Sequence, residues 1–326
     1  MRSSLHRRTL LQAALAAPLA SIAGAALAQP AGRTITIVVP FPPGGSQDVI
    51  ARAVAAQMQL SLKQSVVVDN KPGAGGNIGA MAVARAAPDG QTVLAAGASI
   101  AITPHLQKAS GFDPAKELAG TSLITAGPFL LVANPNAPYQ TLEQFLAYAR
   151  ANPGKVNYGS TGPATTGHLV SEEFARITGT RLFHIPYAGV APANTALLSG
   201  DIHMLWNDVL LSMPGVRAGK VKMLAVATAR RSPVVPDIPT VGESGYPGFE
   251  PAFKFGYFAP AGTPRPIIDK LNAEVLAALE APAIKAAAAE RGWQLAGTSP
   301  EGYARMLTDE IAFWGRIVRD AGIEKQ

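Results

Sequence analysis

The sequence predicts an α/β protein built from two domains. Short runs of β-branched residues, beginning with residues 34–39, alternate with segments of helical periodicity, as in a parallel or mixed sheet covered by helices. The 326 residues are enough for two separate cores. Extended stretches at residues 125–128 and 248–254 are candidate crossings between them. We therefore predict a discontinuous first domain, residues 29–127 plus 252–326, and a continuous second domain, residues 128–251.

Individual elements follow from local patterns. Apolar residues recur every fourth position from Ile50 to Leu62, which predicts a helix with one buried face. Thr141 and Gln144 form a capping box that opens a helix. Two later helices are predicted to begin where a hydroxyl residue precedes proline, at residues 263–264 and 299–300. Further strands are expected at residues 66–68, 92–94, 129–133, 156–159, 182–185, 202–206, 223–227 and 255–259.

The first 28 residues have the pattern of an export signal. Arg7 and Arg8 belong to a basic start, an Ala/Leu-rich stretch follows, and Ala26-Leu27-Ala28 supplies the small residues that signal peptidase recognises. The apolar stretch is too interrupted for a membrane anchor. The arginine pair resembles a twin-arginine signal, and Sec export is the alternative. We therefore expect cleavage before Gln29 and a periplasmic protein.

Composition excludes several other classes of function. The chain has 28 Lys and Arg against 22 Asp and Glu, without a basic run, so nucleic acid is not an expected partner. Cysteine is absent, which excludes disulfides, thiolate metal sites and cysteine nucleophiles. The histidines lack metal-ligand spacing. We expect neither a metal nor a cofactor.

A first candidate binding loop, residues 40–48, lies between a predicted strand and a predicted helix. Its paired glycines would let a ligand approach the backbone, and the helix start beyond them offers unpaired N–H groups and a positive dipole end. Such a loop suits a carboxylate, although a plain turn capped by a side chain is the alternative. The candidate contacts are Phe41, Pro43, Gly44, Gly45, Ser46 and Asp48.

A second loop, residues 159–168, has the same position between strand and helix. Its hydroxyls and N–H groups could hold an anion without a counter-charge. Ligands of open α/β sheets gather beyond the carboxyl ends of the strands, where both loops would lie. The candidate contacts are Ser160, Thr161, Ala164, Thr165, Thr166 and His168.

A third stretch ends the strand predicted at residues 202–206. Trp206 could stack on a ligand, and Asn207 and Asp208 would then point toward the cleft. In the alternative, Trp206 packs in the core and Asp208 caps the next helix. Ser99 is expected as a loop hydroxyl near the same cleft. The glycine-rich residues 73–78 lack the third glycine of a dinucleotide loop, which favours a turn that opens a helix.

Seven blocks of sequence carry a family pattern: residues 39–48, 70–79, 87–90, 151–160, 184–187, 236–241 and 259–264. In these blocks the chain resembles the Bug-type solute receptors of tripartite tricarboxylate transport systems, from about residue 35 to residue 321. The resemblance implies a type II periplasmic binding protein, a Venus flytrap with a hinge between its domains. It also implies that both loops hold ligand carboxylates, partly through water.

The function implied by this resemblance is capture of a small organic carboxylate for membrane uptake. The implied partners are the membrane subunits of the transporter, and the receptor would act as a monomer. A sensor protein as partner is an alternative, and so is a serine hydrolase using Ser99 or Ser160, although no complete catalytic set is evident in the sequence. The chain departs from the family at His203, Trp206 and Asn207, where an acidic residue and an aromatic–Asp pair are usual. We expect this change to favour acids without an ammonium group.

The export signal yields a testable prediction. Protein recovered from the periplasm should begin at Gln29 and carry no lipid, because there is no cysteine to modify. N-terminal sequencing and intact mass measure both properties. A retained leader would contradict the expectation.

Overall fold

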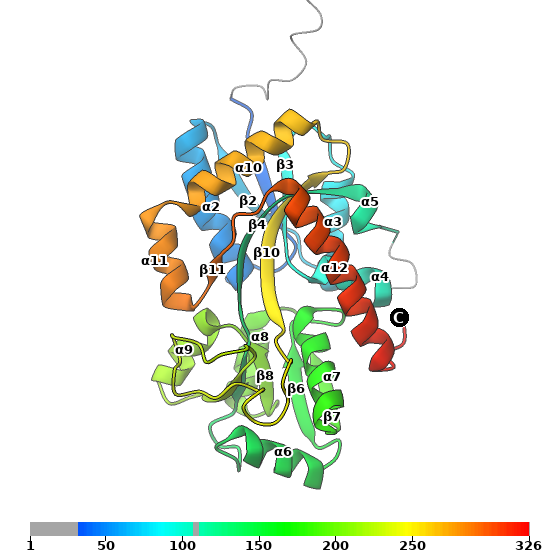
Figure 1. Cartoon of the computed structure of the whole chain (residues 1–326), viewed down its shortest axis with the longest axis vertical. Coiled ribbons are helices and arrows are strands. Elements are labelled where there is room, and N and C mark those ends of the chain that lie inside the picture. Colours follow the sequence, from blue (N-terminus) through cyan, green and yellow to red (C-terminus); the bar gives the residue numbers. More distant parts are fainter. Residues whose placement is uncertain (1–31, 107–110, 326) are drawn as a thin grey trace, which may run out of the picture.

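The computed structural model describes residues 32–106 and 111–325, so the expected export signal lies outside the described residues. Two lobes are stacked along the long axis of the molecule, each built on its own sheet (Figure 1). Within the described residues, no helix is both long and apolar enough to cross a membrane.

The first lobe contains a six-stranded mixed sheet of order β11-β4-β10-β3-β1-β2. Strand β1 pairs in parallel with β2 and β3, whereas β10 is antiparallel to β3 and β4. Four of the five residues of β1 are buried, as expected for a strand with helices on both faces. The strands are β1 (Ile35–Val39), β2 (Val66–Asn70), β3 (Thr92–Ala96), β4 (Leu118–Pro128), β10 (Ala252–Pro260) and β11 (Gln294–Leu295). The helices are α2 (Ser46–Leu62), η1 (Ala74–Gly76), α3 (Asn77–Ala84), α4 (Ser99–Leu106), α5 (Pro114–Glu117), α10 (Arg265–Leu279), α11 (Pro282–Arg291) and α12 (Pro300–Asp320).

The second lobe contains a five-stranded sheet of order β7-β6-β8-β5-β9. Strand β6 is parallel to β7 and β8, and β5 is antiparallel to β8 and β9. The strands are β5 (Leu130–Ala133), β6 (Val156–Ser160), β7 (Leu182–Pro186), β8 (Met204–Asn207) and β9 (Lys222–Val226). The helices are α6 (Leu142–Ala151), α7 (Thr166–Thr178), α8 (Val190–Ser199) and α9 (Val209–Arg217).

An antiparallel strand pair joins the lobes. β4 and β10 pair from Leu118 and Pro260 at one end to Pro128 and Ala252 at the other, and β5 begins two residues after β4 ends. The C-terminal helix α12 packs on β4 and α4 and reaches α7 of the second lobe (Figure 1). Two separate stretches of chain therefore build the first sheet, with the second sheet between them in sequence.

Most predicted elements are present, with informative differences. The Thr141 hydroxyl accepts from the Gln144 N–H, and the Ser299 hydroxyl accepts from the Gly302 N–H, so both predicted caps are confirmed. The helix predicted at residues 263–264 is present as α10, but the predicted Thr263 cap was wrong. The helix begins at Arg265, its N-cap residue is Pro264, and the proline in its first turn is Pro266. The first seven residues of β4 were missed, since residues 118–124 show no strict alternation of apolar and polar residues.

Gly256 on β10 is predicted to be indispensable for packing of α12. A Cβ atom there would overlap the buried ring of Tyr303 and lie 2.5 Å from the Ser122 carbonyl oxygen. We expect Gly256→Ala to lower the free energy of unfolding by about 1–3 kcal/mol. The matched control is Gly262→Ala, whose Cβ would lie 3.7 Å from Pro88. Urea unfolding of both variants checks this, and equal stability of the two would contradict it.

Candidate ligand-binding site

A cavity of about 150 Å³ lies between the lobes. The segments that follow β1 and β3 of the first lobe and β6 and β8 of the second line it, together with β10. A cavity of about this size can hold a molecule as large as benzene. The predicted site residues that line it are Phe41, Gly45, Ser46, Asp48, Ser99, Ser160, Thr161, Thr165, Thr166, Trp206, Asn207 and Asp208.

The remaining predicted residues lie elsewhere. Ala164 and His168 line a larger neighbouring cavity, and Pro43 and Gly44 line neither. Sequence reasoning missed several walls of the inner cavity, including Gly189, which precedes α8 as Gly45 precedes α2. That shared glycine-before-helix pattern could have pointed to it. The aromatic wall, Phe129, Phe253 and Phe255, carried no such local signal.

Three helices direct their N-termini at the inner cavity. The N-cap residues of α2, α7 and α8 are Gly45, Thr165 and Gly189, and none makes a side-chain capping hydrogen bond. All three line the cavity. First-turn N–H groups and the positive ends of the helix dipoles therefore face one small space from both lobes.

Asp48 holds the first glycine loop in shape. Its carboxylate accepts from the Gly44 N–H, from Asn70 Nδ2 and from Arg52 Nε, each at 3.0 Å. Burial acts to raise the pKa of Asp48, but these hydrogen bonds and the Arg52 charge outweigh it and hold the pKa below its ordinary value. The Asp48 carboxylate thus stabilises this loop, in which Gly44 adopts a positive φ of 88°.

The Ser99 hydroxyl is a free polar group at the cavity wall. It begins α4, is 4% exposed, and its Oγ has no hydrogen-bond partner among the described residues. A buried hydroxyl without a partner costs about 1–3 kcal/mol. A ligand oxygen bound in the cavity would supply the missing partner.

The hydroxyls of the second loop divide into two groups. Ser160 Oγ donates to the Gly162 carbonyl at 2.9 Å or to His184 Nε2, which lies at 2.6 Å, and Thr165 Oγ1 donates to the same carbonyl at 2.7 Å. These bonds fold the loop onto itself. Thr161 and Thr166 make no side-chain hydrogen bond within the described residues, and both line the inner cavity.

The third stretch serves the core and the cavity together. Trp206 is 3% exposed and packs against Phe174 and Phe249, with ring centroids at 5.4 and 5.5 Å. Asn207 Nδ2 donates to Asn194 Oδ1 at 3.0 Å, and Asp208 accepts from the Leu211 N–H as the N-cap of α9. The structural alternative and the cavity-lining role considered for these residues therefore coexist.

His203 lies outside both cavities. Its Nδ1 accepts from the Asn157 N–H at 2.9 Å, and the residue lines neither cavity. Of the three positions that depart from the family pattern, only Trp206 and Asn207 face the inner cavity.

The lobes touch each other around the cavity. The Ser46 hydroxyl of α2 donates to the Asp208 carboxylate of the second lobe. A Cβ on Gly75 would lie 3.0 Å from the Pro163 carbonyl oxygen, and one on Gly189 would lie 3.1 Å from Pro42. The lobes therefore approach each other closely at three places beside the cavity.

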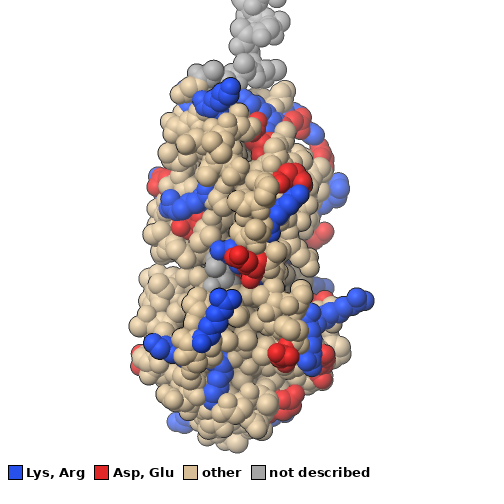
Figure 2. Space-filling view, turned by 90° about the vertical axis from the view of Figure 1, so that its left-hand side faces the viewer, with Lys and Arg blue, Asp and Glu red and all other residues tan. Residues whose placement is uncertain are grey.

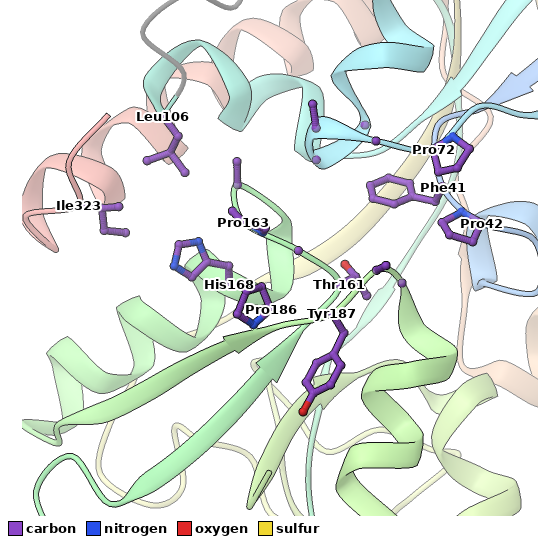
Figure 3. A pocket seen from close by; sticks show the side chains of 18 of the residues that line it. Phe41, Pro42, Pro72, Leu106, Thr161, Pro163, His168, Pro186, Tyr187 and Ile323 are labelled. Carbon is purple, nitrogen blue, oxygen red and sulfur yellow. The ribbon is translucent and has the colours of Figure 1, made fainter. Parts of the chain in front are cut away.

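A second cavity, of about 680 Å³, adjoins the first and lies between the lobes (Figure 3). The two share Phe41, Pro42, Thr161 and Gly189.

On the face of the molecule shown in Figure 2, basic and acidic side chains are scattered over both lobes.

Comparison with known proteins places the chain in a family. Residues 50–323 match the family described as the tripartite tricarboxylate transporter family receptor. The chain belongs to this receptor family. The solved periplasmic binding protein BugD is 34% identical over 90% of this chain and 99% of its own, with a TM-score of 0.86. The family and the fold indicate a periplasmic binding protein.

Two further solved structures contain carboxylates. R. palustris Rpa4515 with adipate is 36% identical, with a TM-score of 0.86, over 90% of this chain and 99% of its own. MatC from Rhodopseudomonas palustris with bound malate is 33% identical, with a TM-score of 0.82, over 88% and 99%. The predicted Bug-type family and two-domain fold are confirmed.

The receptor also contains a serine–histidine pair that sequence reasoning missed. Ser160 Oγ lies 2.6 Å from His184 Nε2, and the His184 ring stacks on His168 at 4.1 Å. Burial, and then the neighbouring His168, lower the pKa of His184 to about 3, which makes it a weak base. Among the described residues, no carboxylate is hydrogen-bonded to His184. The family and fold are those of solute-binding receptors, and the pair joins the second loop to β7.

In the described part of the receptor, no group of three or more His, Asp or Glu side chains is arranged to hold a metal ion.

The Ser46–Asp208 bond is predicted to favour closure. Ser46→Ala removes the donor, and a hydrogen bond to a charged group contributes about 1.5–3 kcal/mol. We expect a larger radius of gyration in small-angle scattering, or ligand affinity lowered at least tenfold. The control is Ser212→Ala, whose hydroxyl donates to the Asp208 carbonyl within the second lobe. If both variants matched the parent receptor, the cross-cleft bond would have no role in closure.

Proposed function

We propose that this receptor captures a small organic carboxylate between its lobes in the periplasm and presents it to the membrane subunits of a tripartite carrier. The observation that carries the proposal is the convergence of three helix N-termini without side-chain caps on one interdomain cavity. The unpartnered Ser99 hydroxyl adds a hydrogen-bond donor. This arrangement suits a negatively charged ligand head.

The charged side chains of the cavity wall already have partners within the protein, which leaves the helix dipoles to hold an anion. Among the residues that the structure describes, Lys254 is the one lysine or arginine that lines the inner cavity. Its ammonium is paired with Glu310 of α12. The carboxylates of Asp48 and Asp208 already accept hydrogen bonds from protein donors. Each helix N-terminus contributes about 0.3–1 kcal/mol toward an anion, and up to about 2 kcal/mol when partly buried.

The wall of the inner cavity also favours binding of acids that lack an ammonium group. Both lining aspartates are engaged with protein groups, so an ammonium ion would meet helix dipoles of unfavourable sign. Phe41, Phe129 and Phe253 add an apolar surface. The relatives carrying adipate and malate support the carboxylate class.

Closure would follow from a hinge between the predicted domains, residues 29–127 plus 252–326 and residues 128–251. A ligand that touches both lobes favours the closed form by its differential affinity for that form. The strand pair β4 and β10 passes between the lobes and is the place where such a hinge would bend. Export through the Sec or twin-arginine route would bring the receptor to the periplasm.

A carboxylate screen tests the proposal. A ligand at one hundred times its dissociation constant stabilises the folded state by about 2.7 kcal/mol, which raises the melting temperature by several degrees. We expect at least one small monocarboxylate or dicarboxylate to do so in a thermal-shift assay. If no acid in a broad panel stabilised the receptor, the proposal would fail.

Gly45 provides the matched variants for this screen. A Cβ there would lie 3.9 Å from Val190, so Gly45→Ala fits, whereas Gly45→Leu fills the space beside the helix N-terminus. We expect calorimetry to show binding by the Ala variant and none by the Leu variant, with normal circular dichroism for both. Unchanged affinity of the Leu variant would refute the assignment of this loop.

A further inference from the structure

The larger, outer cavity adjoins the inner cavity and extends from it toward Ile323. In Figure 3 the shared residues Phe41, Pro42 and Thr161 lie together at one end. Ile323, beyond the end of α12, lies at the other end, and His168 lies between. A ligand whose head occupies the inner cavity therefore has about 680 Å³ of further space beyond Thr161.

The walls of this outer cavity carry little charge. Proline contributes four of the lining residues, at positions 42, 72, 163 and 186, and its ring fixes the backbone φ at each. The ionisable lining residues are His168, Tyr187 and Glu324. Figure 3 shows the Tyr187 ring directed away from the other labelled side chains. No lysine or arginine is among the described residues that line the cavity.

His168 adds a second, independent sign of a ligand. The residue is 8% exposed, and its Nδ1 has no hydrogen-bond partner among the described residues. Stacking on His184 fixes the ring plane. A polar atom left unpaired in this way costs free energy that a ligand group beside it would recover.

We propose that the two cavities form one site for an elongated monocarboxylate, with its head at the helix N-termini and a neutral, mainly apolar tail along the proline-lined cavity. The inference rests on the proposed function and narrows its ligand class. A second carboxylate at the far end would meet Glu324 and no counter-ion among the lining residues that the structure describes. A neutral tail buries apolar surface there, and one polar atom along it can bond to His168.

Calorimetry with a graded series of acids tests the inference on the mature receptor. The series is benzoate, 3-phenylpropionate and 5-phenylvalerate, with adipate as the dicarboxylate and 5-phenylvaleramide as the uncharged analogue. Burying a methylene contributes enough to strengthen binding about two- to fourfold. We expect affinity to rise along the acid series, adipate to bind more weakly than 5-phenylvalerate, and the amide to bind at least tenfold more weakly.

Matched variants locate the tail. Ile323→Asp places a charge at the far end of the outer cavity, and we expect it to reduce the affinity ratio of 5-phenylvalerate to benzoate at least fivefold. Leu60→Asp, on an exposed position of α2 that lines neither cavity, should leave that ratio unchanged.

The outcomes separate the two proposals. If benzoate bound but affinity did not rise with length, or the amide bound as tightly as its acid, the elongated site would be refuted and the carboxylate receptor would stand. If no acid bound, both would be refuted. A ratio equally affected by Ile323→Asp and Leu60→Asp would also refute the elongated site.

Discussion

The pairing of β4 with β10 positions everything that faces the ligand. These strands belong to the sheet of the first lobe, yet their paired ends at Pro128 and Ala252 adjoin the second lobe. Both passages between the lobes therefore lie side by side. The carboxyl ends of β1 and β3 therefore face those of β6 and β8, and the helix starts beyond these strands meet in one cavity.

In the proposed function, N–H groups rather than a buried cation hold the anion, and this has an energetic consequence. A buried arginine left alone after ligand release would carry an uncompensated charge, which costs several kcal/mol. Here the lining lysine, Lys254, keeps Glu310 as its partner, and Asp48 keeps Arg52. After release, water can hydrogen-bond to the helix N-termini and hydroxyls of the cavity wall. If the proposed function holds, the receptor can bind and release its ligand without leaving an isolated charge buried.

Several residues combine structural and binding roles. Asp208 caps α9, accepts the Ser46 hydroxyl across the cleft and lines the inner cavity. Trp206 fills the core beside Phe174 and still lines the cavity. Substitutions at these positions therefore change packing and ligand preference together. For Trp206 and Asp208, the packing or capping role and the place in the cavity wall are therefore both present.

Local sequence determined most of the elements and both candidate loops, residues 40–48 and 159–168. Apolar periodicity, glycine before a helix and the caps at Thr141 and Ser299 act over a few neighbouring residues, so they can be read without the fold. The free Ser99 hydroxyl, the committed charge of Asp48 and the Ser160–His184 contact depend on neighbours distant in sequence. Only the tertiary structure decided them, because packing selects which polar groups find partners and which remain open to a ligand.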